Sequence, residues 1–164
     1  MNVVVCVKQI PDPAEPPSFE DDHTLNRSGK LILDDSDSYG VEMALQLRDK
    51  AGGEVTLVSM APNGEVSGLR TALAMGADKA ILVSDDALSG STALATAKVL
   101  AKAVQRVEEA DLILTATEAT DGYTGTVPAQ LAELLGLPSV TFARHIEIDG
   151  STATVQRQTE AGYD

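Results

Sequence analysis

The chain has 164 residues, of which 43% are hydrophobic and 23% are charged, and it carries 25 acidic against 12 basic side chains. These proportions are typical of soluble globular proteins and argue against a disordered chain. The formal net charge of −13 at pH 7 argues against the basic face that a nucleic-acid-binding protein needs, so no nucleic-acid partner is expected. An anionic ligand would therefore have to be held by backbone N–H groups.

The length and the N-terminus restrict how the chain is organised. Residues 1–164 predict a single domain, because the chain is too short for two ordinary ones. Cys6 is the only cysteine, which excludes an internal disulfide, and its place within VVVCV predicts a buried, unreactive thiol. The run of five apolar residues is too short for a signal peptide or a membrane-spanning helix, so we predict a cytoplasmic protein without a membrane span.

Strand-like and helix-like segments alternate four times along the chain. Apolar β-branched runs predict strands, and apolar residues at helical spacing between a capping residue and a glycine predict helices. This alternation is typical of an α/β fold: three layers, with a mostly parallel sheet covered by helices on both faces, similar to Rossmann and adenine-nucleotide-hydrolase folds. The predicted strands are 3–7, 54–60, 79–84 and 111–115, and the predicted helices are 38–51, 65–75, 91–108 and 126–135.

Three segments depart from this alternation. Four prolines within residues 11–17 predict a surface loop. Residues 23–33 predict a β-hairpin around a Ser-Gly turn, and Asp37 is the expected N-cap of the helix that follows. Near the C-terminus, alternating residues around Asp149 and Gly150 predict a second hairpin. Both hairpins are therefore expected as additions to the parallel sheet.

The expected ligand site lies beyond the carboxyl ends of the parallel strands. Lys8 and Gln9 follow the first strand, and the polar segment TATEATDGYTGT follows the fourth, directly before a helix. A helix N-terminus offers unpaired N–H groups and a partial positive charge, which bind phosphate without Lys or Arg. The alternative is a capping loop that makes only local turns.

Within this segment the residue types suit different parts of a nucleotide. Gly122 and Gly125 allow close approach of the backbone to a phosphate. Asp121 cannot hold a phosphate and is better suited to accept from a ribose hydroxyl or from loop N–H groups. Three threonines add hydroxyl donors: Thr120, Thr124 and Thr126.

Groups that could perform catalysis are scarce. No Walker loop and no G-x-G-x-x-G follows the first strand, which disfavours a P-loop hydrolase and an ordinary NAD dehydrogenase. His23 and His145 are expected on the surface without a Ser or Cys partner. Acidic pairs such as Asp34 and Asp35 are interpreted as solvated turn residues rather than as metal ligands. The residues therefore predict a nucleotide binder with no metal site and no catalytic residue of its own.

Three motifs together resemble the β-subunit family of electron transfer flavoproteins: VVVCVKQIPD, LRTALAMGADKAILV and TEATDGYTGTVPAQLAELLGLPSVTF. The similarity extends over essentially the whole chain, although family members continue further, through an arm that wraps the partner. The resemblance implies a heterodimer with an α subunit, which holds most of one FAD, and AMP or a second FAD in this subunit. It also implies a carrier that takes electrons from dehydrogenases via FAD to the respiratory chain or another acceptor.

The resemblance also implies contacts to the nucleotide beyond the polar loop. Asp37 stands where the family usually has Asn, and the family often carries a hydroxyl or amide at the positions of Gly125 and Val127. The choice between AMP and FAD is therefore open, as is the alternative of a universal-stress-type adenine-nucleotide-binding protein with the same architecture. The implied cofactor-binding residues are Cys6, Asp37, Ser38, Tyr39, Gly40, Met60, Ala116, Thr120, Asp121, Gly122, Tyr123, Thr124, Gly125, Thr126 and Val127.

Overall fold

The computed structural model describes residues 1–164, and its central sheet has four parallel strands in the order β5, β4, β1, β6. In the register of the sheet, Val4 of β1 lies between Thr56 of β4 and Ile113 of β6. All four residues of β1 are buried, as expected of a β-branched central strand that is covered on both faces. The strands are β1 (Val3–Cys6), β4 (Val55–Ala61), β5 (Lys79–Ser84) and β6 (Leu112–Thr115).

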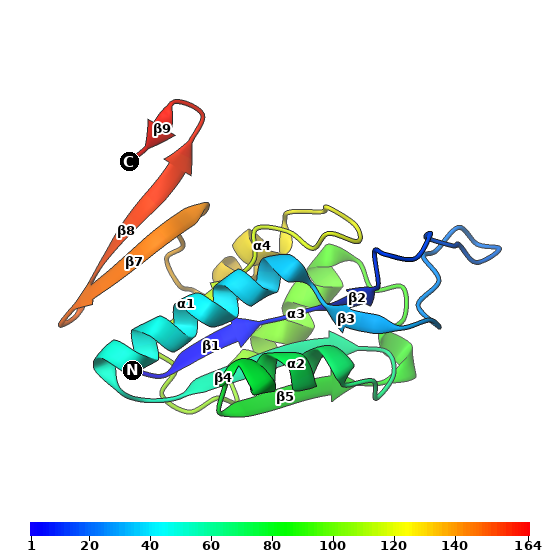
Figure 1. Ribbon diagram of the computed structural model, residues 1–164, viewed down its shortest axis with the longest axis horizontal. Helices are drawn as coiled ribbons and strands as arrows, with labels where there is room; N and C mark the ends of the chain where they lie inside the picture. Colours follow the sequence, from blue (N-terminus) through cyan, green and yellow to red (C-terminus); the bar gives the residue numbers. More distant parts are fainter.

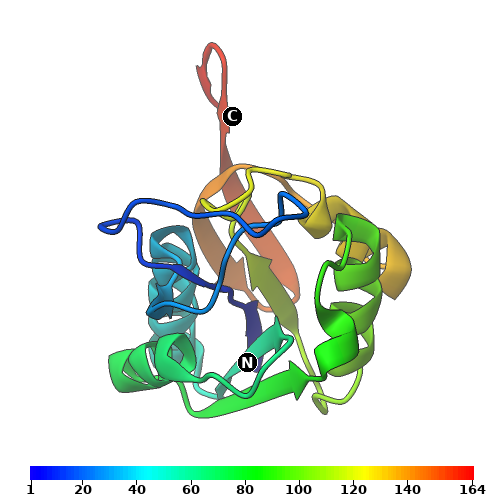
Figure 2. The same cartoon turned by 90° about the vertical axis from the view of Figure 1, so that its right-hand side faces the viewer.

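Helices cover both faces of this sheet (Figure 2). Val3 and Val5 of β1 belong to the hydrophobic cluster formed with α1 and α2, whereas Val4 and Cys6 belong to the one formed with α3 and α4. The side chains of a strand alternate between its two faces, so one strand serves both clusters. The predicted three-layer α/β architecture is therefore confirmed. The helices are α1 (Asp35–Ala51), α2 (Ser67–Met75), α3 (Ala93–Val104) and α4 (Val127–Leu135), with a short 3₁₀ helix η1 (Asp86–Leu88) before α3.

Helix α1 begins earlier than the sequence predicted. Its N-cap is Asp34, whose carboxylate accepts the N–H of Ser36 at 2.9 Å, so the prediction of Asp37 as the N-cap is wrong. Asp34 is fully buried and accepts two hydrogen bonds from Thr120, so its interpretation as a solvated turn residue is likewise wrong. A tertiary contact thus selects which of the nearby acidic residues caps the helix.

The hairpin predicted within residues 23–33 does not form. Strand β3 (Leu31–Leu33) pairs antiparallel with β2 (Gln9–Pro11), and the loop between them contains only the isolated bridge Phe19–Leu25. Leu31 and Leu33 are buried, and the long-range pairing gives β3 a partner next to the core. Pro11 is tolerated in β2 because it stands at the end of a two-stranded ribbon.

The C-terminal region forms a separate three-stranded antiparallel sheet of β7 (Ala143–Asp149), β8 (Thr152–Thr159) and β9 (Gly162–Tyr163). The turn between β7 and β8 confirms the hairpin predicted at Asp149 and Gly150. Figure 1 shows this sheet standing away from the layered body of the molecule. None of the helices combines the length and the apolar character needed to cross a membrane.

Candidate functional site

A cavity of about 620 Å³ lies at the carboxyl edge of the parallel sheet. Its lining comes from the ends of β1, β4 and β6, from the first turns of α3 and α4, and from the loop between β2 and β3. Figure 2 shows that this loop lies at the same end of the sheet as the loop between β6 and α4. Ligands of open parallel sheets bind at this edge, so the cavity occupies the place expected for the site.

The cavity brings together most, but not all, of the residues that the sequence had singled out. Tyr39 is 78% exposed on α1, and Gly40 faces Val5, where an added Cβ would lie 3.6 Å from the valine side chain. Residues outside the lining are Ser38, Tyr39, Gly40, Thr120 and Thr126. Residues within the lining are Cys6, Asp37, Met60, Ala116, Asp121, Gly122, Tyr123, Thr124, Gly125 and Val127.

Asp121 accepts from two cationic side chains at the cavity. Lys8 Nζ lies 2.7 Å from one carboxylate oxygen, and the guanidinium of Arg27 lies 2.5 Å from the other. The Asp121 side chain is only 3% exposed, whereas both cations remain partly open to solvent. Burial alone would raise the pKa of Asp121, but the hydrogen bonds and charges of Lys8 and Arg27 outweigh it and lower this pKa.

This cluster changes the electrostatic expectation for the site. Within this cluster two cations face one carboxylate, so Lys8 and Arg27 can contact an anion in addition to the backbone N–H groups, although the lining also contains the carboxylates of Asp22, Asp37 and Glu118. Sequence reasoning noted Lys8 at a strand end but missed Arg27. The two residues are separated from Asp121 by 113 and 94 positions, so no local pattern could have indicated the pairing.

Asp37 is a second buried carboxylate of the lining. One of its oxygens accepts the backbone N–H of Lys8 at 2.6 Å, which ties the start of α1 to the end of β1. Burial raises the pKa of Asp37 to about 7; the Lys8 hydrogen bond opposes this rise and the nearby Asp34 carboxylate adds to it. Asp37 is therefore partly protonated near neutral pH.

Asp34 fixes the loop between β6 and α4. Its carboxylate accepts both the backbone N–H and the hydroxyl of Thr120, at 2.7 and 3.0 Å. Thr120 therefore points to α1 and holds the loop, instead of lining the cavity as a hydroxyl donor. The same carboxylate caps α1, so one buried side chain positions two elements of the site.

Gln9 is a buried polar residue of the lining, which the sequence placed after the first strand but did not include among the cofactor-binding residues. Its carboxamide donates to the carbonyl of Glu65 and accepts the N–H of Gly68, both at 2.7 Å. A Cβ on Gly68 would lie 2.6 Å from the Gln9 side chain, so only glycine fits at this point of α2. The carboxamide thus satisfies an N–H group in the first turn of α2, so this group is not free to bind a ligand.

Helix α4 begins at the cavity without a side-chain cap. Thr126 is its N-cap residue but makes no capping hydrogen bond, and Pro128 stands in its first turn. Gly125 has φ of 66°, a left-handed conformation that suits glycine. Unpaired N–H groups at a helix N-terminus attract anions, so the first turn of α4 is suited to bind a phosphate group.

Cys6 contributes a buried thiol to the lining. Burial, together with the Asp37 carboxylate, raises its pKa to about 12. The thiol is therefore protonated and unreactive at neutral pH, as the sequence predicted. The two histidines, His23 and His145, are exposed and lie outside the cavity.

Residues 22–164 match the family described as the electron transfer flavoprotein domain. The chain belongs to this family. It is 41% identical over 165 residues to the electron transfer flavoprotein subunit beta of Thermoanaerobacterium thermosaccharolyticum, a match that covers 100% of this chain and 63% of the relative. It is 42% identical to the corresponding subunit of Megasphaera elsdenii, with 99% of this chain and 63% of that relative covered.

A further relative has a different name. The chain is 39% identical to the caffeyl-CoA reductase-Etf complex subunit CarD of Acetobacterium woodii, over 100% of this chain and 63% of the relative. The chain thus spans 63% of the length of these curated relatives. The resemblance that the three sequence motifs indicated is confirmed.

Proposed function

We propose that the chain is the nucleotide-binding part of an electron transfer flavoprotein β subunit. Its cavity binds AMP or a second FAD, and the α subunit of the complex holds most of the electron-carrying FAD. Together the two subunits take electrons from dehydrogenases and pass them to the respiratory chain or another acceptor. The observation that carries this proposal is the cavity itself, which joins the uncapped start of α4 to the Asp121 cluster with Lys8 and Arg27.

The chemistry of the lining supports a nucleotide as the ligand. The first turn of α4, together with Lys8 and Arg27, suits a phosphate, while Met60 and Leu100 add apolar surface to the lining. The lining contains no His, and its one thiol is protonated. The subunit is therefore proposed to act as a carrier component and not as a catalyst in its own right. A cytoplasmic location is a separate part of the proposal.

The ligand released from the purified native complex tests this proposal most directly. The complex should be yellow and contain a larger partner subunit, and mass spectrometry of the released ligands should find FAD, with or without AMP. A colourless homodimer that releases ATP would contradict the proposal and would support a universal-stress-type adenine-nucleotide-binding protein instead.

Substitution of Gly125 tests the position of the phosphate. Gly125→Glu should abolish nucleotide retention, because Glu118 Oε2 already lies 3.4 Å from the Cβ position and a second carboxylate would repel the phosphate. Gly125→Asn is the matched control, since Asn tolerates the left-handed backbone and adds no charge. It should retain more nucleotide than the Glu variant. Equal retention by both variants and the unmodified chain would show that the phosphate lies elsewhere.

A further inference from the structure

Tyr123 is the one aromatic residue that lines the cavity, in a chain with three Tyr, two Phe and no Trp. It is 65% exposed, so it lies at the rim of the cavity and not in a hydrophobic core. An exposed ring alone needs no explanation, because single apolar side chains are common on protein surfaces. The place of Tyr123 at the cavity and its backbone conformation do need an explanation.

The backbone of Tyr123 has φ of 50°, in the left-handed region that a bulky side chain rarely adopts. His23, Glu109 and Phe142 also have positive φ, but none of them lines the cavity. The N–H of Tyr123 donates to the carbonyl of Ala119 at 2.9 Å, which fixes this turn. Gly or Asn would adopt the same turn with less strain, so the turn itself does not call for an aromatic ring.

The neighbours of Tyr123 are the groups that suit a phosphate. Asp121, with its two bound cations, lies two residues before it, and Gly125, at the start of α4, lies two residues after it. A planar ring system joined to a phosphate at this loop would therefore come within reach of the tyrosine ring. Aromatic side chains stack on planar heterocycles, and such stacking contributes substantially to binding.

We propose that Tyr123 is a specificity-determining residue whose ring stacks on the planar ring system of the bound nucleotide. This inference rests on the proposed function, because it requires a nucleotide in the cavity. Two planar groups are able to form this stack: the adenine of AMP, and the isoalloxazine of a FAD that extends past its phosphates to the rim of the cavity. The stack favours nucleotides over simple phosphates and sugar phosphates.

Calorimetric titration of the 164-residue chain with AMP and with FAD tests the stack. Tyr123→Leu should weaken binding of the stacked ligand about tenfold, whereas Tyr123→Phe, which keeps the ring, should bind within about twofold of the unmodified chain. If adenine is stacked, both ligands weaken to the same extent. If isoalloxazine is stacked, FAD weakens and AMP does not, and either pattern supports the proposal.

Three controls separate stacking from a structural role. Tyr163→Leu removes a similarly exposed ring in β9, outside the cavity, and should leave both affinities unchanged. Ribose 5-phosphate, which has no ring system, should bind the Tyr123→Leu variant as it binds the unmodified chain. Tyr123→Asn should melt at the same or a higher temperature because it relieves the backbone strain, yet it should lose affinity as Tyr123→Leu does.

Two results would overturn the inference, and they differ in what they contradict. If the unmodified chain binds AMP or FAD and Tyr123→Leu binds both equally well, the role of the ring is wrong while the proposed function stands. If the unmodified chain binds neither nucleotide, the proposed function fails and the stack fails with it.

Discussion

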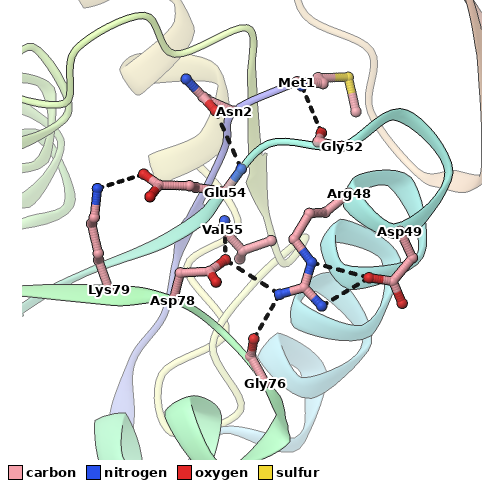
Figure 3. Close-up of polar contacts among 10 residues, drawn as sticks. All are labelled: Met1, Asn2, Arg48, Asp49, Gly52, Glu54, Val55, Gly76, Asp78 and Lys79. Carbon is pink, nitrogen blue, oxygen red and sulfur yellow. Dashed lines mark hydrogen bonds and ion pairs between the residues drawn. The ribbon is translucent and has the colours of Figure 1, made fainter.

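The two ends of the parallel sheet carry charged clusters of the same form but of different burial. At the carboxyl edge, the buried Asp121 carboxylate faces Lys8 and Arg27. At the amino edge, the Arg48 guanidinium faces Asp49 and Asp78, at 2.9 and 3.2 Å, and donates to the carbonyl of Gly76 (Figure 3). In each cluster, one charged side chain forms ion pairs with two side chains of the opposite charge.

The two clusters differ in whether water can solvate a charged group once its partner is removed. The acidic side chains at the amino edge are open to solvent: Asp49 is 68% and Asp78 37% exposed, and Glu54, which pairs with Lys79, is 49% exposed. Water solvates such groups when their partner is removed, so exposed pairs contribute little to stability. Asp34, Asp37 and Asp121 at the carboxyl edge are shielded from water, so their partners and protonation states affect folding and the cavity. Buried charge is therefore concentrated at the end of the sheet that holds the cavity.

The largest expected effect is the pH dependence that Asp37 confers. Its folded-state pKa is raised above the unfolded value, so its contribution to stability is present below pH 4 and is lost as pH rises through about 7. Asp37→Asn keeps an acceptor for the Lys8 N–H and removes the ionisation. At pH 8 it should increase the free energy of unfolding by up to about 4 kcal/mol relative to the unmodified chain.

Urea denaturation at pH 4 and pH 8 measures this effect. The two proteins should have the same stability at pH 4, because both side chains are then neutral. Asp34 and Lys8 also face Asp37, and they are unchanged in both proteins. Parallel stability curves across this pH range would show that Asp37 ionises normally in the folded chain.

A smaller effect is expected at Asp121, with the opposite pH dependence. Lys8 and Arg27 lower its pKa, so its stabilising contribution is present above the unfolded pKa and is lost as pH falls through the folded one. Asp121→Asn should reduce the free energy of unfolding at pH 7 by about 2 kcal/mol, the loss of hydrogen bonds to a charged group. The same denaturation series measures it, with Asp78→Asn at the amino edge as the comparison. An equal loss at Asp78 would contradict the distinction between the two edges.

The smallest effect is expected at the Lys79–Glu54 pair. Both side chains are exposed, so Lys79→Met should leave the denaturation midpoint unchanged within experimental error, at low and at high salt. A clear loss of stability that disappears in high salt would show that the amino edge also depends on its charges.

The position of the cavity could be predicted from the sequence because the signals for it are local. The polar segment TATEATDGYTGT stands between a strand and a helix, and this placement alone indicates the carboxyl edge of a parallel sheet. The C-terminal hairpin at Asp149 and Gly150 follows from a turn signal between two alternating runs in the same way. Local turn and periodicity signals are sufficient wherever an element's partner is its neighbour in sequence.

The sequence predictions were wrong where a contact between residues far apart in the chain determined which local structure forms. The predicted Ser-Gly hairpin turn does not form: the N–H of Ser28 donates to the Asn26 side chain, and β3 pairs with β2 and not with the segment before Ser28. The sequence predicted Asp37 as the cap, whereas Asp34 takes this role and is also held by its hydrogen bonds from Thr120. The pairing of β3 and the N-cap of α1 both depend on contacts between residues far apart in the chain, which a local sequence pattern does not contain.

The sequence by itself determined the layered α/β architecture, the acidic character and the polar loop at the carboxyl edge, because periodicity, composition and turn chemistry are properties of neighbouring residues. Only the tertiary structure decided which carboxylates are buried and which cations face them. Asp121 meets Lys8 and Arg27 across 113 and 94 residues, and the energetics of a charge depend on its three-dimensional surroundings. The charge of the cavity is thus a property of the folded chain.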